Sequence, residues 1–238
     1  MAHEVDSRWV EIDVGDKEMS AYVSAPRGHE ARPAVVVVQE IFGVTRHIRS
    51  VCERLAHAGY VAVAPDVFHR QSNRFETQYT NLAPGLERMR KLREQDFLSD
   101  TDALLRWLRA RPEVRRDRVG VIGFSMGGRL AFLVACSRDV QAAASFYGAG
   151  IAAGLLDRAS QLRCPLLMVF GAEDMMIPPA DVEKIQAALG NQPKPFEIVV
   201  YPKASHGFFC SERESYEKES AEDAWERVMK LFSTHLRH

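Results

Sequence analysis

The sequence predicts a three-layer, doubly wound α/β fold with a mostly parallel central sheet and an antiparallel hairpin at its N-terminal edge. Two observations predict it. Continuous apolar runs, which are typical of strands buried on both faces, alternate along the chain with segments of helical spacing. The first two strand-like segments instead alternate apolar with polar residues, as half-buried strands do. The chain has no repeat, linker or low-complexity tract, so we expect residues 1–238 to form a single domain.

The hairpin is predicted by residues 9–14 and 19–23, which alternate with a period of two on either side of Gly15-Asp16. The remaining strands are predicted by apolar runs at residues 34–38, 60–64, 119–122, 142–147, 165–170 and 196–201. Helical spacing predicts helices within residues 48–56, 98–108, 128–135, 181–189 and 216–236. The stretch 71–95 shows no clear period and is predicted to be irregular.

The segment Gly123-Phe124-Ser125-Met126-Gly127 joins a predicted strand directly to a predicted helix. This G-x-S-x-G arrangement is the nucleophile elbow of α/β-hydrolases. The serine must occupy a tight, strained turn, and glycines flank it because side chains there would collide with the neighbouring strand or helix. The helix N-terminus and the Met126 amide then point to where an oxyanion would form. The alternative is a glycine-rich turn with an idle serine.

A serine hydroxyl needs a base to take its proton and an acid to orient that base. In this fold the chain order is serine, acid, histidine. Asp174 and Glu173 follow the strand at 165–170, and His206 follows the last strand. Asp174 is favoured over Glu173 because it lies further past the strand end. The alternatives are a turn-forming aspartate ahead of two prolines and a structural loop histidine.

The other histidines are weaker candidates for the base. His69 ends a strand but precedes the serine, which is the wrong order. His47 and His57 fall on or near the first predicted helix, where we expect them to be solvated. The rest lie near the termini or in a turn.

The loop after residues 34–38 should supply a second oxyanion amide, for which Ile41 is the candidate. The neighbouring Glu40 is unusual at a site that must stabilise negative charge. It either braces the loop through backbone or arginine, or it bonds the resting nucleophile and is displaced when substrate binds.

Composition excludes several function classes. The formal net charge is −1 and there is no basic stripe, so neither nucleic acid nor a membrane surface is an expected partner. The longest apolar stretch is too short to span a bilayer, and the polar N-terminus predicts no signal peptide. The four cysteines lack metal-site or redox spacing, so no bound metal is expected. Cys52, Cys136 and Cys164 fall within apolar patterns, which predicts buried thiols in a reducing cytoplasm, whereas Cys210 lies close to His206 and is left open.

Several segments together resemble the dienelactone hydrolase (carboxymethylenebutenolidase) family over nearly the whole chain. They are Gln39–Gly43, Ile48-Arg49, Cys52–Ala56, Gly59–Asp66, the elbow, His206–Phe208 and Ala224–Arg227. The resemblance implies hydrolysis of a small-molecule lactone or ester, without a cofactor, by a cytoplasmic enzyme. It also implies that Glu40 contacts the nucleophile before substrate arrives. The sequence leaves open whether the protein is a monomer or a dimer.

Two positions depart from the family pattern. The dienelactone hydrolases proper carry cysteine at the elbow, whereas this chain has Ser125, which is not ionised at neutral pH and must depend on His206. Cys210 stands where the family has an arginine that holds a substrate carboxylate. Arg74, Arg88 or Arg90 could substitute, and a broader ester or lactone substrate is equally compatible. Candidate pocket residues are Arg74, Tyr79, Tyr147 and Phe208, although aromatic residues in such loops are more often core.

These residues predict acyl transfer to water through Ser125, His206 and Asp174, with the amides of Ile41 and Met126 as oxyanion donors. One alternative is a non-catalytic relative that binds a small acid or a partner in the same cleft. Another is a thiol enzyme that uses Cys210 beside His206, although no resolving cysteine stands at motif spacing.

Overall fold

The structure, a computed structural model, describes residues 3–190 and 192–237. Eight strands form a sheet in the order β1-β2-β4-β3-β5-β6-β7-β8, which confirms the α/β class with a mostly parallel sheet and an antiparallel N-terminal pair. The chain divides into two compact units, Met1–Val119 and Gly120–His238. Strand β5 (Val114–Phe124) begins in the first unit and ends in the second.

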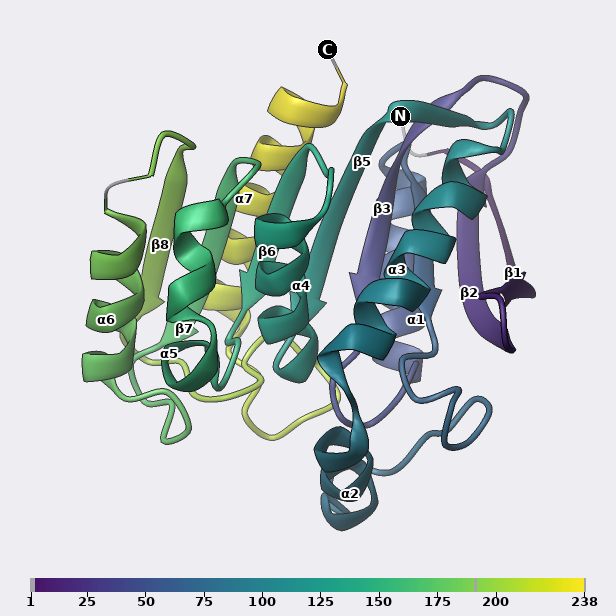
Figure 1. Ribbon diagram of the computed structural model, residues 1–238. Coiled ribbons are helices and arrows are strands. Elements are labelled where there is room, and N and C mark those ends of the chain that lie inside the picture. The colour runs from purple at the N-terminus through teal and green to yellow at the C-terminus, as the bar shows by residue number, and fades with distance from the viewer. Residues whose placement is uncertain (1–2, 191, 238) are drawn as a thin grey trace. The chain divides into compact units, whose positions relative to one another are not determined.

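The first unit contains the predicted hairpin, formed by β1 (Val5–Asp13) and β2 (Glu18–Pro26) in antiparallel register. Strand β3 (Arg32–Val38) runs parallel to β4 (Val61–Pro65), and β4 in turn pairs antiparallel with β2. Helices α1 (Arg46–His57) and α3 (Glu94–Arg109) lie on opposite faces of these strands (Figure 1). Strands covered on both faces need continuous apolar sequence, which explains the uninterrupted valine run of β3.

Helix α1 buries the apolar face that the sequence predicts, and its last turn is closed by Gly59 at a φ of 95°. The expectation that His47 is solvated was wrong, because its exposed fraction is 6%. His47 precedes Val51 and Leu55 at intervals of four residues, so all three side chains lie on the buried stripe of the helix.

The prediction that residues 71–95 are irregular was also wrong, since this stretch contains α2 (Ala83–Lys91) and the start of α3. Leu82, Leu86 and Met89 do have helical spacing, but the first and last of them are exposed and α2 buries only Gly85. Within the first unit, α2 lies beyond the carboxyl ends of β3 and β4 (Figure 1).

The second unit contains the end of β5 and three further parallel strands, β6 (Ala142–Phe146), β7 (Leu166–Gly171) and β8 (Phe196–Tyr201). Helices α4 (Met126–Ser137) and α6 (Pro179–Leu189) lie on one face, and α7 (Lys218–Leu236) lies on the other (Figure 1). Between β6 and β7 the chain forms the short α5 (Ile151–Gly154) and the 3₁₀ helix η1 (Leu156–Gln161). Neither is long enough to show a sequence period.

Helix α4 is apolar on nearly all sides, and only Arg129 and Ser137 among its residues are not buried. A helix of this kind is enclosed by its surroundings rather than laid on a surface. Ser125, which precedes the first residue of α4, is therefore attached to a helix that is packed on nearly all sides.

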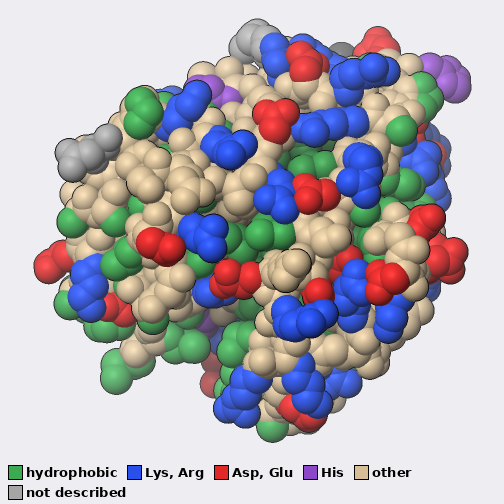
Figure 2. Space-filling view, viewed as in Figure 1, with side chains coloured by type: hydrophobic (Ala, Val, Ile, Leu, Met, Phe, Trp, Pro, Cys, Tyr) green, Lys and Arg blue, Asp and Glu red, His purple; other side chains and the backbone are tan. Residues whose placement is uncertain are grey.

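Charges of both signs are interspersed over the face of the molecule in view (Figure 2). Cys52, Cys136 and Cys164 are buried and form no disulfide, as the sequence predicts, and Cys210 is buried as well. Among the described residues, none of the helices combines the length and the apolar character needed to cross a membrane.

Candidate active site

Ser125 joins β5 to α4 in a strained conformation, with φ 52° and ψ −116°. Positive φ is unfavourable for a residue with a side chain and persists only where the surroundings enforce it. Two backbone bonds do so here. The Ser125 N–H donates to the Phe146 carbonyl of β6 over 2.9 Å, and the Ser125 carbonyl accepts from the Arg129 N–H of α4 over 3.1 Å.

The glycines around Ser125 are required by close backbone approach. A Cβ on Gly123 would lie 1.9 Å from the Gly127 carbonyl oxygen, and one on Gly128 would lie 2.4 Å from that of Phe146. Backbone atoms cannot yield as a flexible side chain would, so only glycine fits. The Ser145 hydroxyl adds a further tie by donating to the Gly128 carbonyl over 2.8 Å.

Three side chains far apart in the sequence meet at this turn. The Ser125 Oγ lies 2.8 Å from His206 Nε2, and His206 Nδ1 lies 2.7 Å from Asp174 Oδ2. A carboxylate bonded at Nδ1 keeps the proton of the neutral imidazole on that nitrogen. The lone pair of Nε2 then faces the serine hydroxyl, which is the arrangement that a general base needs.

The loops after β7 and β8 interlock to hold Asp174 and His206. A Cβ on Gly171 would lie 2.1 Å from the Ala204 carbonyl oxygen, which instead accepts from the Glu173 N–H over 2.9 Å. Glu173 is exposed, whereas the Asp174 side chain is fully buried. The geometry thus places Asp174, and not Glu173, against the imidazole.

One feature of the acid was not readable from the sequence. The Met176 N–H donates to Asp174 Oδ1 over 2.8 Å, so the two carboxylate oxygens have different partners. Only the turn conformation after β7 brings this amide within reach, and no sequence signal marks it.

Tyr147 and Phe208, two of the predicted pocket residues, are fully buried. The Tyr147 ring packs edge-on against the His206 imidazole, with centroids 5.2 Å apart, and against Phe208 at 5.4 Å. Tyr147 also has a positive φ of 37°. Both rings therefore brace the histidine loop.

Glu40, Ile41 and Tyr79 lie in or next to the loop that follows β3. Glu40 is 1% exposed and Ile41 is 8% exposed, and the Gly43 N–H closes the loop by donating to the Glu40 carbonyl over 3.4 Å. The Tyr79 hydroxyl lies 3.0 Å from the hydroxyl of Thr45. Arg74 is engaged elsewhere: its guanidinium pairs with Glu11 over 2.8 Å and lies over the ring of Trp9.

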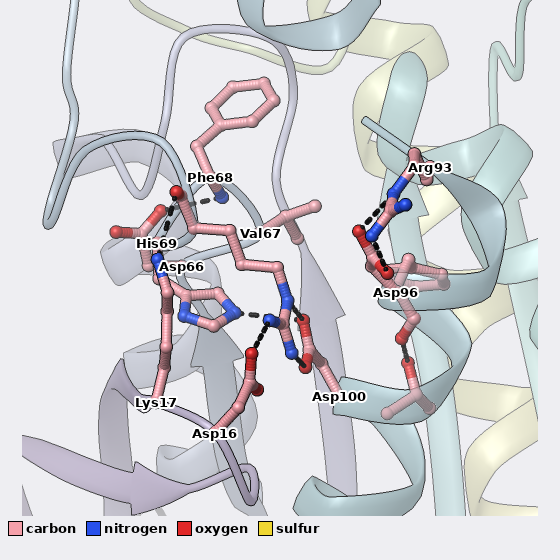
Figure 3. A network of polar contacts seen from close by, with 12 residues as sticks. Asp16, Lys17, Asp66, Val67, Phe68, His69, Arg93, Asp96 and Asp100 are labelled. Carbon is pink, nitrogen blue, oxygen red and sulfur yellow. Dashed lines mark hydrogen bonds and ion pairs between the residues drawn. The ribbon is translucent and has the colours of Figure 1, made fainter. Parts of the chain in front are cut away.

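His69, the rival histidine, has a different environment. Its Nε2 lies 2.9 Å from Asp100 Oδ2, and the same carboxylate receives two bonds from Arg70 (Figure 3). Arg70 also reaches Asp16 in the hairpin turn over 2.7 Å. This network ties α3 to the loop after β4 and to the hairpin, and it includes no serine or cysteine.

The Cys210 thiol, invoked by the alternative thiol mechanism, is fully buried. Across residues 3–190 and 192–237, no cluster of three or more His, Cys, Asp or Glu side chains is placed to hold a metal ion.

Comparison with known proteins identifies the relatives of this chain. The sequence model of the dienelactone hydrolase family matches residues 19–236. The chain belongs to the dienelactone hydrolase family. A Synechocystis protein named "Putative carboxymethylenebutenolidase" is 40% identical to this family member over 248 aligned residues that cover all of both chains. Membership makes the protein a hydrolase of carboxylic esters or lactones with a small-molecule substrate, as the sequence predicts.

Solved structures agree with this membership. The crystal structure of a "Putative Dienelactone Hydrolase" from Klebsiella pneumoniae is 34% identical, with a TM-score of 0.88 over 98% of this chain and 100% of the other. A dienelactone hydrolase-like promiscuous phosphotriesterase from metagenomic libraries has a TM-score of 0.84 over 99% of each chain. At 21% identity, that second likeness shows the fold alone.

Proposed function

We propose that Ser125 is the nucleophile, His206 the general base and Asp174 the orienting acid of an acyl-enzyme mechanism. The observation that carries the proposal is the unbroken relay from Ser125 Oγ to His206 Nε2 and from His206 Nδ1 to Asp174 Oδ2, over 2.8 and 2.7 Å. Both distances are those of hydrogen bonds that can pass or stabilise a proton.

The chemistry divides into two halves. Ser125 Oγ attacks the substrate carbonyl while its proton moves to His206 Nε2, and the buried Asp174 carboxylate stabilises the imidazolium that forms. The imidazolium returns the proton to the leaving alkoxide as the carbon–oxygen bond breaks. Water, deprotonated by His206, then attacks the acyl-serine. As the bond between the acyl carbon and Ser125 Oγ breaks, the imidazolium returns the proton to Oγ and the acid is released. In a lactone, the leaving alcohol stays attached to the acyl group.

The tetrahedral intermediates need donors for their oxyanion. We assign the amide of Met126, at the N-terminus of α4, and the amide of Ile41 in the loop 39–43, which we call the oxyanion loop. Each such donor is typically worth roughly 3–4 kcal/mol of transition-state stabilisation. Glu40 either braces this loop or contacts Ser125 before substrate binds, and its burial is compatible with both.

The relatives named carboxymethylenebutenolidase make a lactone the first substrate to consider. Two features favour a wider range. The Arg74 guanidinium is engaged by Glu11 and Ser20, and position 210 holds a buried thiol rather than a cation. We therefore assign small esters and lactones in general, with no requirement for a carboxylate on the substrate.

The remaining assignments concern the whole protein. It acts as a single domain, without a cofactor, in the cytoplasm, as a monomer or a dimer. The mixed surface charge and the net charge of −1 support a small molecule rather than nucleic acid or a membrane as its partner.

Substitution of the serine tests the mechanism. Ser125→Ala should lower turnover of p-nitrophenyl acetate by several orders of magnitude and abolish labelling by a fluorophosphonate probe, because both need the hydroxyl. Ser160→Ala, at an exposed serine of η1, is the matched control and should keep both. Turnover at the level of the control in folded Ser125→Ala would rule out this mechanism.

A further inference from the structure

We infer that residues 75–85, here called the cover segment, position the oxyanion loop, and that Gly85 is the central contact. The inference rests on the proposed function, because it assumes that the Ile41 amide is an oxyanion donor. It goes beyond that function by assigning a catalytic task to a segment that contains none of the reacting groups. Every contact that carries it lies within the first unit.

Gly85 contacts the oxyanion loop at Ile41, the residue whose amide we assign as an oxyanion donor. A Cβ on Gly85 would lie 2.4 Å from the Ile41 carbonyl oxygen and 3.1 Å from its carbonyl carbon. The first turn of α2 thus rests on the backbone of Ile41, with nothing but a hydrogen atom between them. This contact also explains why Gly85 is the one buried residue of a helix whose other residues are exposed or partly exposed.

A second group of contacts fixes the backbone of Phe42 and Gly43, the next two residues of the loop. The Thr77 N–H donates to the Phe42 carbonyl over 3.1 Å, and Glu76 forms an isolated antiparallel bridge with Gly43. A Cβ on Gly43 would lie 1.8 Å from the Phe75 carbonyl oxygen. The cover segment therefore adds a short strand-like edge to the loop, and this edge needs glycine at position 43.

Side chains reinforce the same alignment. The Tyr79 ring packs edge-on against Phe42, with centroids 4.8 Å apart, and its hydroxyl lies 3.0 Å from that of Thr45. Glu76 forms an ion pair with Arg49 of α1, and Arg49 also donates to the Val44 carbonyl over 2.6 Å. These bonds tie the cover segment to the chain on the far side of the loop.

The direction of the Ile41 N–H depends on the two peptide planes that flank Ile41. The Ile41 N–H and the Glu40 carbonyl belong to one planar peptide and point in opposite directions. That carbonyl accepts from the Gly43 N–H and from Gln39 Nε2, each over 3.4 Å. The next plane, which contains the Ile41 carbonyl, is pressed by Gly85. With both planes held, the Ile41 N–H keeps one orientation, which is what a preorganised oxyanion donor requires.

The cover segment therefore acts through the loop, and its residues are positioning residues. A positioning role predicts a loss in kcat with little change in KM, since the oxyanion forms only in the transition state. A role in substrate binding alone would raise KM instead.

The test is Gly85→Ala, which forces a methyl group onto the Ile41 carbonyl. The kcat for p-nitrophenyl acetate should fall about 10- to 100-fold, part of the effect of losing one donor, while KM changes less than about threefold. Affinity for an aryl trifluoromethyl ketone, whose adduct with Ser125 carries an oxyanion, should fall by a similar factor. Gly190→Ala is the control, because its Cβ would meet nothing closer than 3.4 Å.

Each outcome decides the inference. Folded Gly85→Ala with the kcat and ketone affinity of the control, or with a loss confined to KM, overturns it. If Gly85→Ala does not fold by circular dichroism, Tyr79→Phe replaces it. This variant removes only the hydroxyl and should lower kcat and ketone affinity about threefold or more, whereas unchanged values overturn the inference. Failure of the proposed function is separate, because Ser125→Ala would then keep its turnover.

Discussion

Asp174 uses its two carboxylate oxygens for different partners, and this decides how the imidazole is oriented. Oδ2 bonds His206 Nδ1, while Oδ1 accepts from the Met176 N–H. Because the backbone amide is a donor that cannot reverse its role, the oxygen facing it must remain an acceptor. A replacement of the same shape at position 174 must therefore keep an acceptor opposite the Met176 amide. Only the atom that faces His206 can change from acceptor to donor.

Asp174→Asn exploits this constraint. The asparagine oxygen should turn to the Met176 amide, so its NH₂ group faces Nδ1 and forces the imidazole proton onto Nε2. A base with its proton on Nε2 cannot accept one from Ser125, so we expect kcat to fall roughly 10³- to 10⁴-fold with the fold intact. Steady-state hydrolysis of p-nitrophenyl acetate measures the loss.

The control for this variant is Asp181→Asn, at a partly exposed aspartate in the first turn of α6 that pairs with Lys184. It removes the same charge from the same unit and should keep activity within about twofold. An Asp174→Asn enzyme that retains a tenth of the wild-type kcat would contradict the assigned role of this carboxylate.

At the residue scale, the sequence predicts chemistry better than it predicts contacts. Ser125, Asp174 and His206 were nominated from one motif and a chain order, because each follows a strand whose carboxyl end faces the same edge of the sheet. Arg74 was nominated as a pocket residue, yet its guanidinium pairs with Glu11 in β1. Long side chains choose partners by three-dimensional proximity, which a linear pattern does not contain.

Among the elements, α2 shows most clearly what periodicity misses. A helix is recognised in a sequence by its apolar stripe. The short stripe of α2, formed by Leu82, Leu86 and Met89, is not buried, and the helix packs through the backbone at Gly85 instead. The buried helices α1 and α4 and the parallel strands were predicted because their packing is carried by apolar side chains.

The turn that follows β4 depends on a buried carboxylate. Asp66 is 1% exposed and accepts from the Phe68 N–H over 3.0 Å and from the Arg74 N–H over 2.6 Å. Burial raises the pKa of Asp66 to about 6, although the two amides, His69 and Arg74 act to lower it. The folded state therefore binds a proton at Asp66 more tightly than the unfolded state does.

This pKa has a definite consequence for stability. A raised folded-state pKa gives a contribution that is fully present below about pH 4 and is lost as the pH rises through about 6. The free energy of unfolding of wild type minus that of Asp66→Asn should fall by up to about 3 kcal/mol between pH 4 and pH 7. The loss of one acceptor in the variant adds an offset that does not depend on pH.

Urea unfolding at several pH values measures this difference, and carboxyl-carbon NMR of Asp66 locates its midpoint. Asp117→Asn, at an exposed aspartate, is the control variant. The burial argument would be refuted if the difference in free energy of unfolding between wild type and Asp66→Asn stayed constant from pH 4 to pH 7 and the Asp66 carboxyl titrated with a midpoint below 4.5.

For the whole molecule, the alternation of apolar runs and helical segments was enough to predict the fold class, because layer architecture follows from which faces must be buried. The strand order was not predicted, because pairing depends on long-range geometry. In that order β5 lies at the centre, with β3 and β6 as its neighbours, and it begins in one compact unit and ends in the other.

A strand shared in this way should make the two units unfold together, as the single-domain proposal requires. The buried thiols report on each unit. Cys52 lies on α1 of the first unit and Cys136 on α4 of the second, and burial raises the pKa of both thiols. Iodoacetamide reacts with thiolate, so either cysteine should be modified only when its surroundings open.

We therefore expect equal opening free energies at Cys52 and Cys136, within about 0.5 kcal/mol, and the same dependence on urea concentration. Variants that keep one cysteine each, with the other three replaced by serine or alanine, allow alkylation to be followed by mass spectrometry. A thiol in one unit that reacts with a much smaller urea dependence reports local fraying rather than unit opening. Two steep transitions at different urea concentrations would mean that the units unfold independently, and the chain would then have to be treated as two domains joined through β5.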